Sequence, residues 1–202
     1  MTRICLAVLL ALSTVAVTAA PKLTNVWKSP EVARLSFAGK KVAALVLTSS
    51  MSLQMSGEEA LARELTARGV GGVATYRIAP GEVLKNVETA KAWFEKTKVE
   101  GVVALRPVRR EKTREASAVV WTSGYYPSFW GYYGYGWNNV YVPISTRDVT
   151  TITVETLVYD VTRDQLVWAA TSDTRDPETL QDFIKDLVNA AVKEMRKMKL
   201  VG

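Results

Sequence analysis

Histidine is absent from this 202-residue chain, and cysteine occurs once, as Cys5. The missing histidine excludes a Ser-His-Asp triad, and with a single cysteine no zinc site can be built from His and Cys ligands. No serine has a lysine three residues later, which excludes a nucleophile of the S-x-x-K type. One cysteine cannot form a disulfide within the chain, so packing has to hold the fold together. Carboxylates, hydroxyls, lysine and arginine remain for chemistry, and we expect no enzymatic activity, no cofactor and no bound metal.

The first residues have the three regions of a secretory signal. Arg3 supplies a positive charge, an uncharged apolar stretch follows, and small residues end it. We predict a signal peptide over residues 1–19, cleaved between Ala19 and Ala20, and hence an exported protein that is periplasmic or associated with the outer envelope. The alternative is an uncleaved anchor, but the apolar stretch is shorter than the roughly 20 residues that a spanning helix needs. Cys5 lies too early to be the acylated cysteine of a lipoprotein.

The charge balance is mildly basic, with a formal net charge of +6. Such an excess attracts nucleic acid and anionic surfaces. An exported protein rarely meets nucleic acid, so we expect an envelope protein or an anionic or glycan envelope polymer as the partner. Peripheral contact with a membrane and self-association into a homo-oligomer both stay open.

The first half of the chain alternates between strand and helix patterns. Residues 41–48 form a nearly continuous apolar run, typical of a parallel strand that is buried on both faces. A capping box at Ser56–Glu59 and a glycine at Gly69 bound a predicted helix. Together the patterns predict strands at 41–48, 73–78 and 101–105 and helices at 58–68 and 86–98. This order implies right-handed crossovers and a parallel β-α-β-α-β core.

The second half adds antiparallel strands and a last helix. Strands are predicted at 118–122, 149–161 and 166–171, and the last two are joined by a polar turn. Asp176 and Pro177 have the pattern of an N-cap and first helical residue, and the apolar residues that follow recur with helical spacing. We therefore predict one three-layer-like α/β domain over 40–202, with a mixed sheet and a C-terminal amphipathic helix, preceded by an N-terminal extension at 20–39.

The segment 121–142 has an unusual composition. No charged residue occurs between Ala116 and Thr146, and ten of the eighteen aromatic residues lie there. Glycine at this density is unfavourable in helix and strand interiors, so we predict an aromatic, glycine-rich loop. Its rings have three alternative fates: a local cluster, a surface that binds a protein or glycan, or a membrane boundary. The candidate interaction residues are Tyr125, Tyr126, Phe129, Trp130, Tyr132, Tyr133, Tyr135 and Trp137.

A basic run, Arg106–Glu115, stands just before the aromatic segment. It holds five basic residues and two acids, a pattern that favours a solvated strand surface. Beside an aromatic loop, Arg109 and Arg110 are also candidates for holding an anionic polymer. Ser49–Ser52 lies at the carboxyl end of the first parallel strand, where open α/β sheets bind ligands. With no base at hand we interpret it as a polar loop, and it is the best place for a small ligand.

Paired carboxylates are the one catalytic arrangement that the composition leaves open. Asp148, Glu155 and Asp160 are the candidates for an enzyme acting on envelope glycans, because general acid–base catalysis needs two carboxyl groups in one cleft. Glu155 and Asp160 are an odd number of residues apart in one strand, so their side chains are expected on opposite faces. We therefore rank this alternative below a non-enzymatic binding protein.

Several segments together resemble uncharacterised bacterial envelope proteins, many of them lipoproteins. The resemblance is carried by Lys41–Leu47, Arg68-Gly69, Val99–Val103, Glu155–Asp160 and Gln165–Trp168. These proteins often carry a Tyr/Gly/Trp-rich insertion before the last hairpin. The fold is also similar to that of the penicillin-binding-protein activator lipoproteins and of the periplasmic part of the curli secretion channel. The resemblance implies an α/β fold in the cell envelope and assigns no active site.

Overall fold

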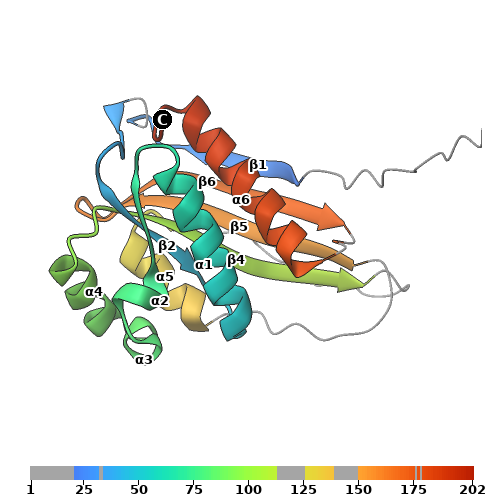
Figure 1. Ribbon diagram of the computed structural model, residues 1–202, viewed down its shortest axis with the longest axis horizontal. Coiled ribbons are helices and arrows are strands. Elements are labelled where there is room, and N and C mark those ends of the chain that lie inside the picture. The colour runs from blue at the N-terminus through green and yellow to red at the C-terminus, as the bar shows by residue number, and fades with distance from the viewer. Residues whose placement is uncertain (1–20, 32–33, 113–125, 139–149, 176, 178) are drawn as a thin grey trace, which may run out of the picture.

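A six-stranded mixed sheet forms the centre of the computed structural model, which describes residues 21–31, 34–112, 126–138, 150–175, 177 and 179–202 (Figure 1). The predicted signal peptide at 1–19 and the predicted strand at 118–122 lie outside these residues. The strand order is β1-β6-β5-β4-β2-β3. The strands are β1 (Lys22–Lys28), β2 (Lys41–Val46), β3 (Gly71–Ala74), β4 (Gly101–Lys112), β5 (Thr150–Asp160) and β6 (Gln165–Arg175).

Helices cover both faces of this sheet. One face packs against α1 (Met51–Thr66) and α6 (Leu180–Lys197), which lie in front of the sheet in Figure 1. The other face packs against α4 (Val87–Lys96) and α5 (Phe129–Asn138), beside the short helices α2 (Thr75–Ile78) and α3 (Gly81–Leu84). Each face buries its own apolar cluster. The predicted three-layer α/β domain with a mixed sheet is confirmed.

The parallel part of the sheet is β3-β2-β4, as the alternating pattern predicts. The second predicted strand, 73–78, is only partly right, because the ladder ends at Ala74 and α2 follows. The backbone N–H of Tyr76 donates to the buried carboxylate of Glu58 at 2.8 Å, and the Thr75 hydroxyl donates to the Ala44 carbonyl at 2.5 Å. These two contacts replace further pairing with β2 and turn the chain into a helix.

Both long helices on the first face begin at residues other than those predicted. Helix α1 begins at Met51, where the Ser50 hydroxyl accepts a hydrogen bond from the Leu53 N–H, so Ser56 is an interior residue and not a cap. Helix α6 begins at Leu180 with Thr179 as its N-cap. Side-chain capping contacts thus set these two boundaries. The predicted apolar stripe of the last helix is confirmed, because it is buried from Phe183 to Met195.

Two strands extend the sheet beyond the predicted elements. Strand β1 lies in the predicted N-terminal extension and pairs antiparallel with β6 at the sheet edge. Strand β4 continues past Leu105 through the basic run and pairs with β5 as far as Lys112. In the part of the chain that the structure describes, no helix is long and apolar enough to cross a membrane.

Candidate functional site

The centre of the aromatic segment is the helix α5, and the prediction of a loop is wrong for residues 129–138. Phe129, Tyr132, Tyr133 and Gly136 recur at the spacing of one helix face and are buried. Phe129, Tyr132 and Tyr133 belong to the apolar cluster on the second face of the sheet. Burial of large rings against the sheet outweighs the roughly 1 kcal/mol by which each glycine disfavours a helix. Glycine also allows close approach, since a Cβ at Gly136 would collide with the Leu47 side chain.

A polar turn in another part of the chain fixes the start of α5. The Asp164 carboxylate, in the turn between β5 and β6, accepts hydrogen bonds from the Ser128 hydroxyl at 2.6 Å and the Trp130 N–H at 3.3 Å. The Leu166 N–H donates to the Pro127 carbonyl at 2.9 Å. A carboxylate is stabilising at a helix N-terminus because the first N–H groups carry partial positive charge. The turn therefore anchors the helix over the sheet.

The aromatic candidates divide into two groups by exposure. Phe129, Tyr132 and Tyr133 are buried, so they cannot meet a partner without unfolding. Those that remain partly exposed are Tyr126, Trp130, Tyr135 and Trp137. Tyr125 lies outside the described residues. Of the three fates considered for the rings, packing within the protein is the one that the structure shows for the buried group.

Below α5, the structure buries an ion pair where a solvated strand surface was predicted. Arg106 and Glu155 are 2% and 1% exposed, and the guanidinium donates to one carboxylate oxygen at 3.0 and 2.8 Å. The rings of Tyr132 and Tyr135 lie 5.6 and 4.5 Å from the guanidinium carbon. Burial raises the pKa of Glu155, and the nearby Arg106 opposes that rise. The prediction of a solvated basic run is thus wrong for Arg106, because the carboxylate of β5 compensates its charge.

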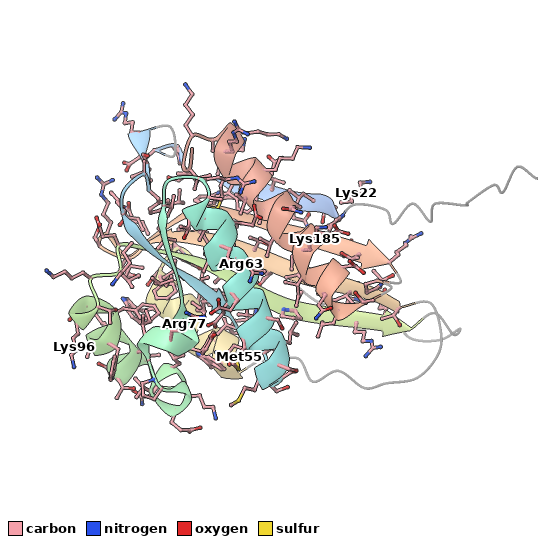
Figure 2. The ribbon with its side chains drawn as sticks, viewed as in Figure 1. Lys22, Met55, Arg63, Arg77, Lys96 and Lys185 are labelled. Atoms are coloured by element: carbon pink, nitrogen blue, oxygen red, sulfur yellow. The ribbon has the colours of Figure 1, made fainter. Side chains whose placement is uncertain are left out.

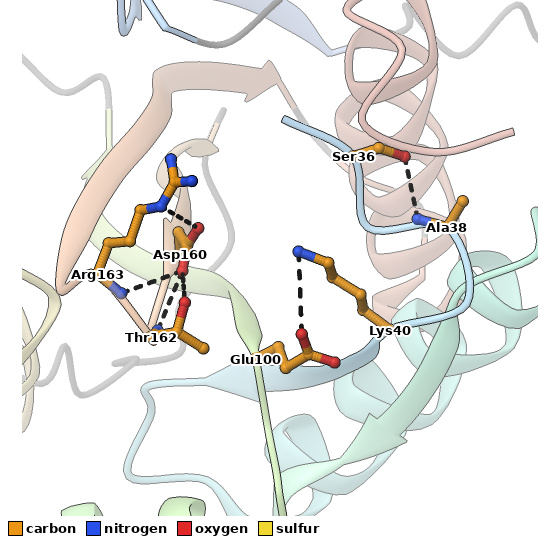
Figure 3. Close-up of polar contacts among 7 residues, drawn as sticks. All are labelled: Ser36, Ala38, Lys40, Glu100, Asp160, Thr162 and Arg163. Carbon is orange, nitrogen blue, oxygen red and sulfur yellow. Dashed lines mark hydrogen bonds and ion pairs between the residues drawn. The ribbon is translucent and has the colours of Figure 1, made fainter. Parts of the chain in front are cut away.

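The carboxylate pair considered for catalysis does not assemble in the described residues. Glu155 is enclosed beside Arg106, whereas Asp160 holds the turn that follows β5 (Figure 3). The Asp160 carboxylate accepts hydrogen bonds from the N–H and hydroxyl of Thr162 at 3.0 and 2.6 Å and from the Arg163 N–H at 3.2 Å. Asp148 lies outside the described residues. Glu155 and Asp160 therefore have separate structural contacts.

An open groove of about 670 Å³ lies beside the first turn of α5 and is called the Trp130 groove below. Trp130 packs on Phe94 and Phe129, with ring centroids 5.8 and 4.8 Å away. The Lys91 ammonium lies 5.9 Å from the Trp130 ring centroid. The lining residues are Lys91, Glu95, Lys98, Val99, Glu100, Trp130, Val161, Thr162 and Asp164. The groove thus combines one aromatic ring with charged groups of both signs and a hydroxyl.

Sequence reasoning identified Trp130 but missed the rest of the groove. Lys91 and Glu95 come from α4, Glu100 precedes β4, and Thr162 and Asp164 come from the turn after β5. No motif joins these residues, because they become neighbours only when α4, α5 and the turn meet at the same end of the sheet. A Glu100 carboxylate oxygen lies 3.9 Å from the Lys40 ammonium. Figure 3 shows the two side chains pointing toward each other.

The two basic candidates lie on opposite faces of β4. Arg110 lines a pocket on the α1 and α6 face together with its cross-strand partner Ile152. Arg109 follows a register shift after Pro107 and forms an ion pair with Glu111 on the other face. Neither arginine lines the Trp130 groove. Among the described residues, the two basic candidates thus lie apart from the groove that Trp130 lines.

Comparisons with known proteins give a distant structural likeness. No protein-family model matches the sequence, and curated proteins also give no match. A leucine-to-methionine variant of the PelC dodecamer from Paraburkholderia phytofirmans is similar at a TM-score of 0.48 and 17% identity, over 89% of this chain and 99% of that one. A second PelC dodecamer structure gives 0.47 and 16%, over 89% and 97%. A likeness at this level does not define a family for the chain.

Proposed function

We propose that this is an exported, non-enzymatic cell-envelope protein that binds an envelope polymer in the Trp130 groove. The observation that carries the proposal is the groove itself, in which a partly exposed tryptophan borders charged groups of both signs. Export is supported by the predicted signal peptide. The proposal keeps the predicted role for the aromatic segment and restricts it to the ring that remains accessible beside a groove.

The groove suits an extended polymer with rings and polar substituents. An indole provides a flat apolar face on which a sugar ring can stack, while the hydroxyl and charged groups around it can hydrogen-bond to the substituents. Trp130 is held by Phe94 and Phe129, so little conformational freedom is lost when a ligand covers its exposed part. The groove opens to solvent, so a ligand can approach the indole from outside the protein.

The positions and contacts of the predicted catalytic carboxylates support binding over catalysis. Glu155 is 1% exposed and is hydrogen-bonded to Arg106, so a glycan cannot reach it. Asp160 accepts three hydrogen bonds within its own turn. Neither carboxylate lines the Trp130 groove. A pair of carboxyl groups facing one sugar ring is therefore not formed by these two residues.

Co-sedimentation with purified peptidoglycan tests the proposal, with a matched pair of variants on α4. Lys91→Ala/Glu95→Ala removes two exposed groove residues, whereas Glu88→Ala/Lys96→Ala removes the same charges from the same helix outside the groove. Figure 2 shows Lys96 extending from α4 into solvent. We expect the groove variant to bind severalfold more weakly and the control to bind like the unmodified protein. Equal binding by all three proteins would overturn the proposal.

Trp130→Ala gives a second test, because the stacking ring should contribute most of the affinity. We expect binding to fall about tenfold, as is typical of a central tryptophan in an interface. Trp93→Ala is the control, since Trp93 is also a partly buried tryptophan of this region but does not line the groove. Thermal melting of both variants has to show that they are folded before binding is compared.

Crosslinking in intact cells separates a polymer from a protein partner. A photoreactive residue at position 130 would be activated, and the captured material would be identified by mass spectrometry and sugar analysis. Capture of glycan supports the proposal. Capture of protein alone would show that the partner is a protein and not a polymer.

A further inference from the structure

The methionines of the chain fall into two groups by exposure. Apart from Met1, which starts the predicted signal peptide, they are Met51, Met55, Met195 and Met198. Met195 and Met198 are 0% and 8% exposed and belong to the apolar cluster that α1 and α6 cover. Met51 and Met55 are 73% and 40% exposed. The same thioether group is thus placed both in the core and on the surface of one molecule.

The two exposed methionines are neighbours on α1. Met51 is the first residue of the helix, and Met55 follows four residues later, a spacing that places side chains next to each other on a helix surface. Figure 2 shows Met55 near the N-terminal end of α1. The buried residues of the helix begin later, at Gly57, and include Leu61 and Leu65. The first turns of α1 therefore present two thioethers to solvent.

Neither exposed methionine is needed to fill the core. Met51 and Met55 belong to neither apolar cluster, and they are not among the partly buried side chains that pack against those clusters. Leu53, which lies between them in the sequence, does pack against the first cluster. An apolar side chain that stays this exposed gains little from burial. Its thioether is reactive, however, because oxidation of methionine depends on access of the oxidant to the sulfur.

We infer that Met51 and Met55 form a paired oxidation site, at which hydroperoxides convert both thioethers to sulfoxides while the protein stays folded. In each step a sulfur lone pair attacks one peroxide oxygen and the O–O bond breaks. The sulfur is oxidised and keeps that oxygen as S=O. The other oxygen is reduced, takes up the proton of the transferred oxygen, and leaves as water or, from an organic hydroperoxide, as an alcohol. The predicted export would place this site in an oxidising compartment.

Oxidation at this site changes the surface of α1 and leaves the core intact. A sulfoxide is polar where the thioether was apolar, which disrupts a core but is tolerated where the group already meets water. Met51 and Met55 meet water, whereas Met195 does not. The modification is reversible, since methionine sulfoxide reductases restore the thioether. It is also independent of the proposed polymer binding, because neither exposed methionine lines the Trp130 groove.

Treatment of the purified protein with hydrogen peroxide, followed by peptide mapping in a mass spectrometer, tests the inference. We expect one added oxygen on each exposed methionine, with Met51 reacting before Met55, in the order of their exposure. Met195 and Met198 should react at least about tenfold more slowly, because peroxide reaches them only when this part of the fold opens. Oxidation of Met195 as fast as of Met51 would overturn the inference, and so would a folded protein in which Met51 and Met55 take up no oxygen.

The same treatment in concentrated urea separates the effect of the fold from that of the local sequence. Unfolding removes the shielding of the buried pair, so all four thioethers should then react at similar rates. If Met51 and Met55 keep their lead in urea, their sequence neighbours determine the selectivity, and the assignment to the folded structure is wrong.

Leucine variants supply a matched pair, because leucine replaces methionine at nearly the same volume. Met51→Leu/Met55→Leu should take up no oxygen in the time in which the original protein is oxidised at both sites. Met195→Leu/Met198→Leu makes the same change in the core and should be oxidised at both surface sites as before. The doubly oxidised original protein should melt within a few degrees of the untreated protein. A large fall of its melting temperature would show that the two side chains support the core, and would overturn the inference of a surface site.

Discussion

Arg106 on β4 and Glu155 on β5 are direct cross-strand neighbours, and their charged groups meet inside the protein below α5. Both side chains are almost fully buried, and the rings of Tyr132 and Tyr135 cover the guanidinium. Each charge is tolerated there because the other is present. The pair thus links the sheet to the aromatic helix.

The first prediction concerns this pair. Arg106→Met should lower the free energy of unfolding by about 3–5 kcal/mol, because it leaves the Glu155 carboxylate buried without its counter-charge. Arg106→Met/Glu155→Leu should lose clearly less than the sum of the two single changes. Urea unfolding of the four proteins at neutral pH measures this coupling. If the loss of unfolding free energy in the double variant equals the sum of the losses in the two single variants, the two side chains do not interact.

The second prediction is that α5 belongs to the core. Phe129→Ala should lower the free energy of unfolding by about 3–5 kcal/mol. Trp168→Ala, on the other face of the sheet, should lower it by as much, since both rings are 0% exposed. Trp130→Ala should cost less, because that ring is partly exposed. Chemical unfolding of the three variants tests the order. A cost for Phe129→Ala below about 1 kcal/mol would contradict the packing of α5.

The third prediction uses the glycines of α5 to test that it is a helix. Gly131 is exposed, and a Cβ there would meet only ordinary contacts at 3.9 Å, so Gly131→Ala should stabilise the protein by about 0.5–1 kcal/mol. Gly136→Ala should instead destabilise it by about 1–3 kcal/mol, because the new methyl collides with the buried Leu47. Thermal melting of both variants distinguishes the cases. If neither change follows this pattern, the segment is not helical in solution.

The fourth prediction concerns the contribution of Glu58 to the pH dependence of the protein's stability. Burial raises the pKa of this carboxyl above its ordinary value of 4.5, against the hydrogen bonds from the backbone of Tyr76 and Val46. The folded state therefore holds its proton more tightly than the unfolded chain. The stabilisation from this group is present below pH 4.5 and is lost as the pH rises through the raised pKa.

Glu58→Gln removes this titration and tests the sign. Urea unfolding between about pH 4 and pH 7 should show a smaller fall of stability with rising pH in the variant than in the original protein. At a fixed pH the variant should be less stable by about 1–3 kcal/mol, because one amide oxygen cannot replace two carboxylate oxygens that accept from Val46 and Tyr76. A steeper fall in the variant would contradict the direction of the pKa shift.

The sequence predicted the elements whose pattern has a single structural solution. The apolar run at β2 and the stripe of α6 are long and regular, so they could be buried in only one way. The parallel core followed from their order along the chain. The N-terminal strand β1 was not predicted, since it lies at an edge with much of its surface exposed and has a weak pattern.

The tertiary structure decided the features that depend on a neighbour far away in the chain. The alternation of glycine and aromatic residues predicted a loop, yet the sheet provides the apolar surface on which Phe129 and Tyr133 pack as part of a helix. Arg106 looked solvated, yet Glu155 of another strand compensates its charge. The local helix propensity is worth about 1 kcal/mol or less per residue, whereas the loss of a buried ring, or of one partner of a buried ion pair, costs about 3–5 kcal/mol.

The Trp130 groove and the pocket that Arg110 lines were likewise only partly predictable from the sequence. From the sequence alone, Trp130 was an accessible aromatic candidate and Ser50 stood at the ligand-binding end of a parallel strand. Only the fold placed α4 and the turn holding Asp164 beside Trp130, and only the register shift in β4 turned Arg110 toward Ser50 and Arg109 away from it. Periodicity along the chain determines which face of an element is buried, but the meeting of side chains from separate elements is set by how those elements pack.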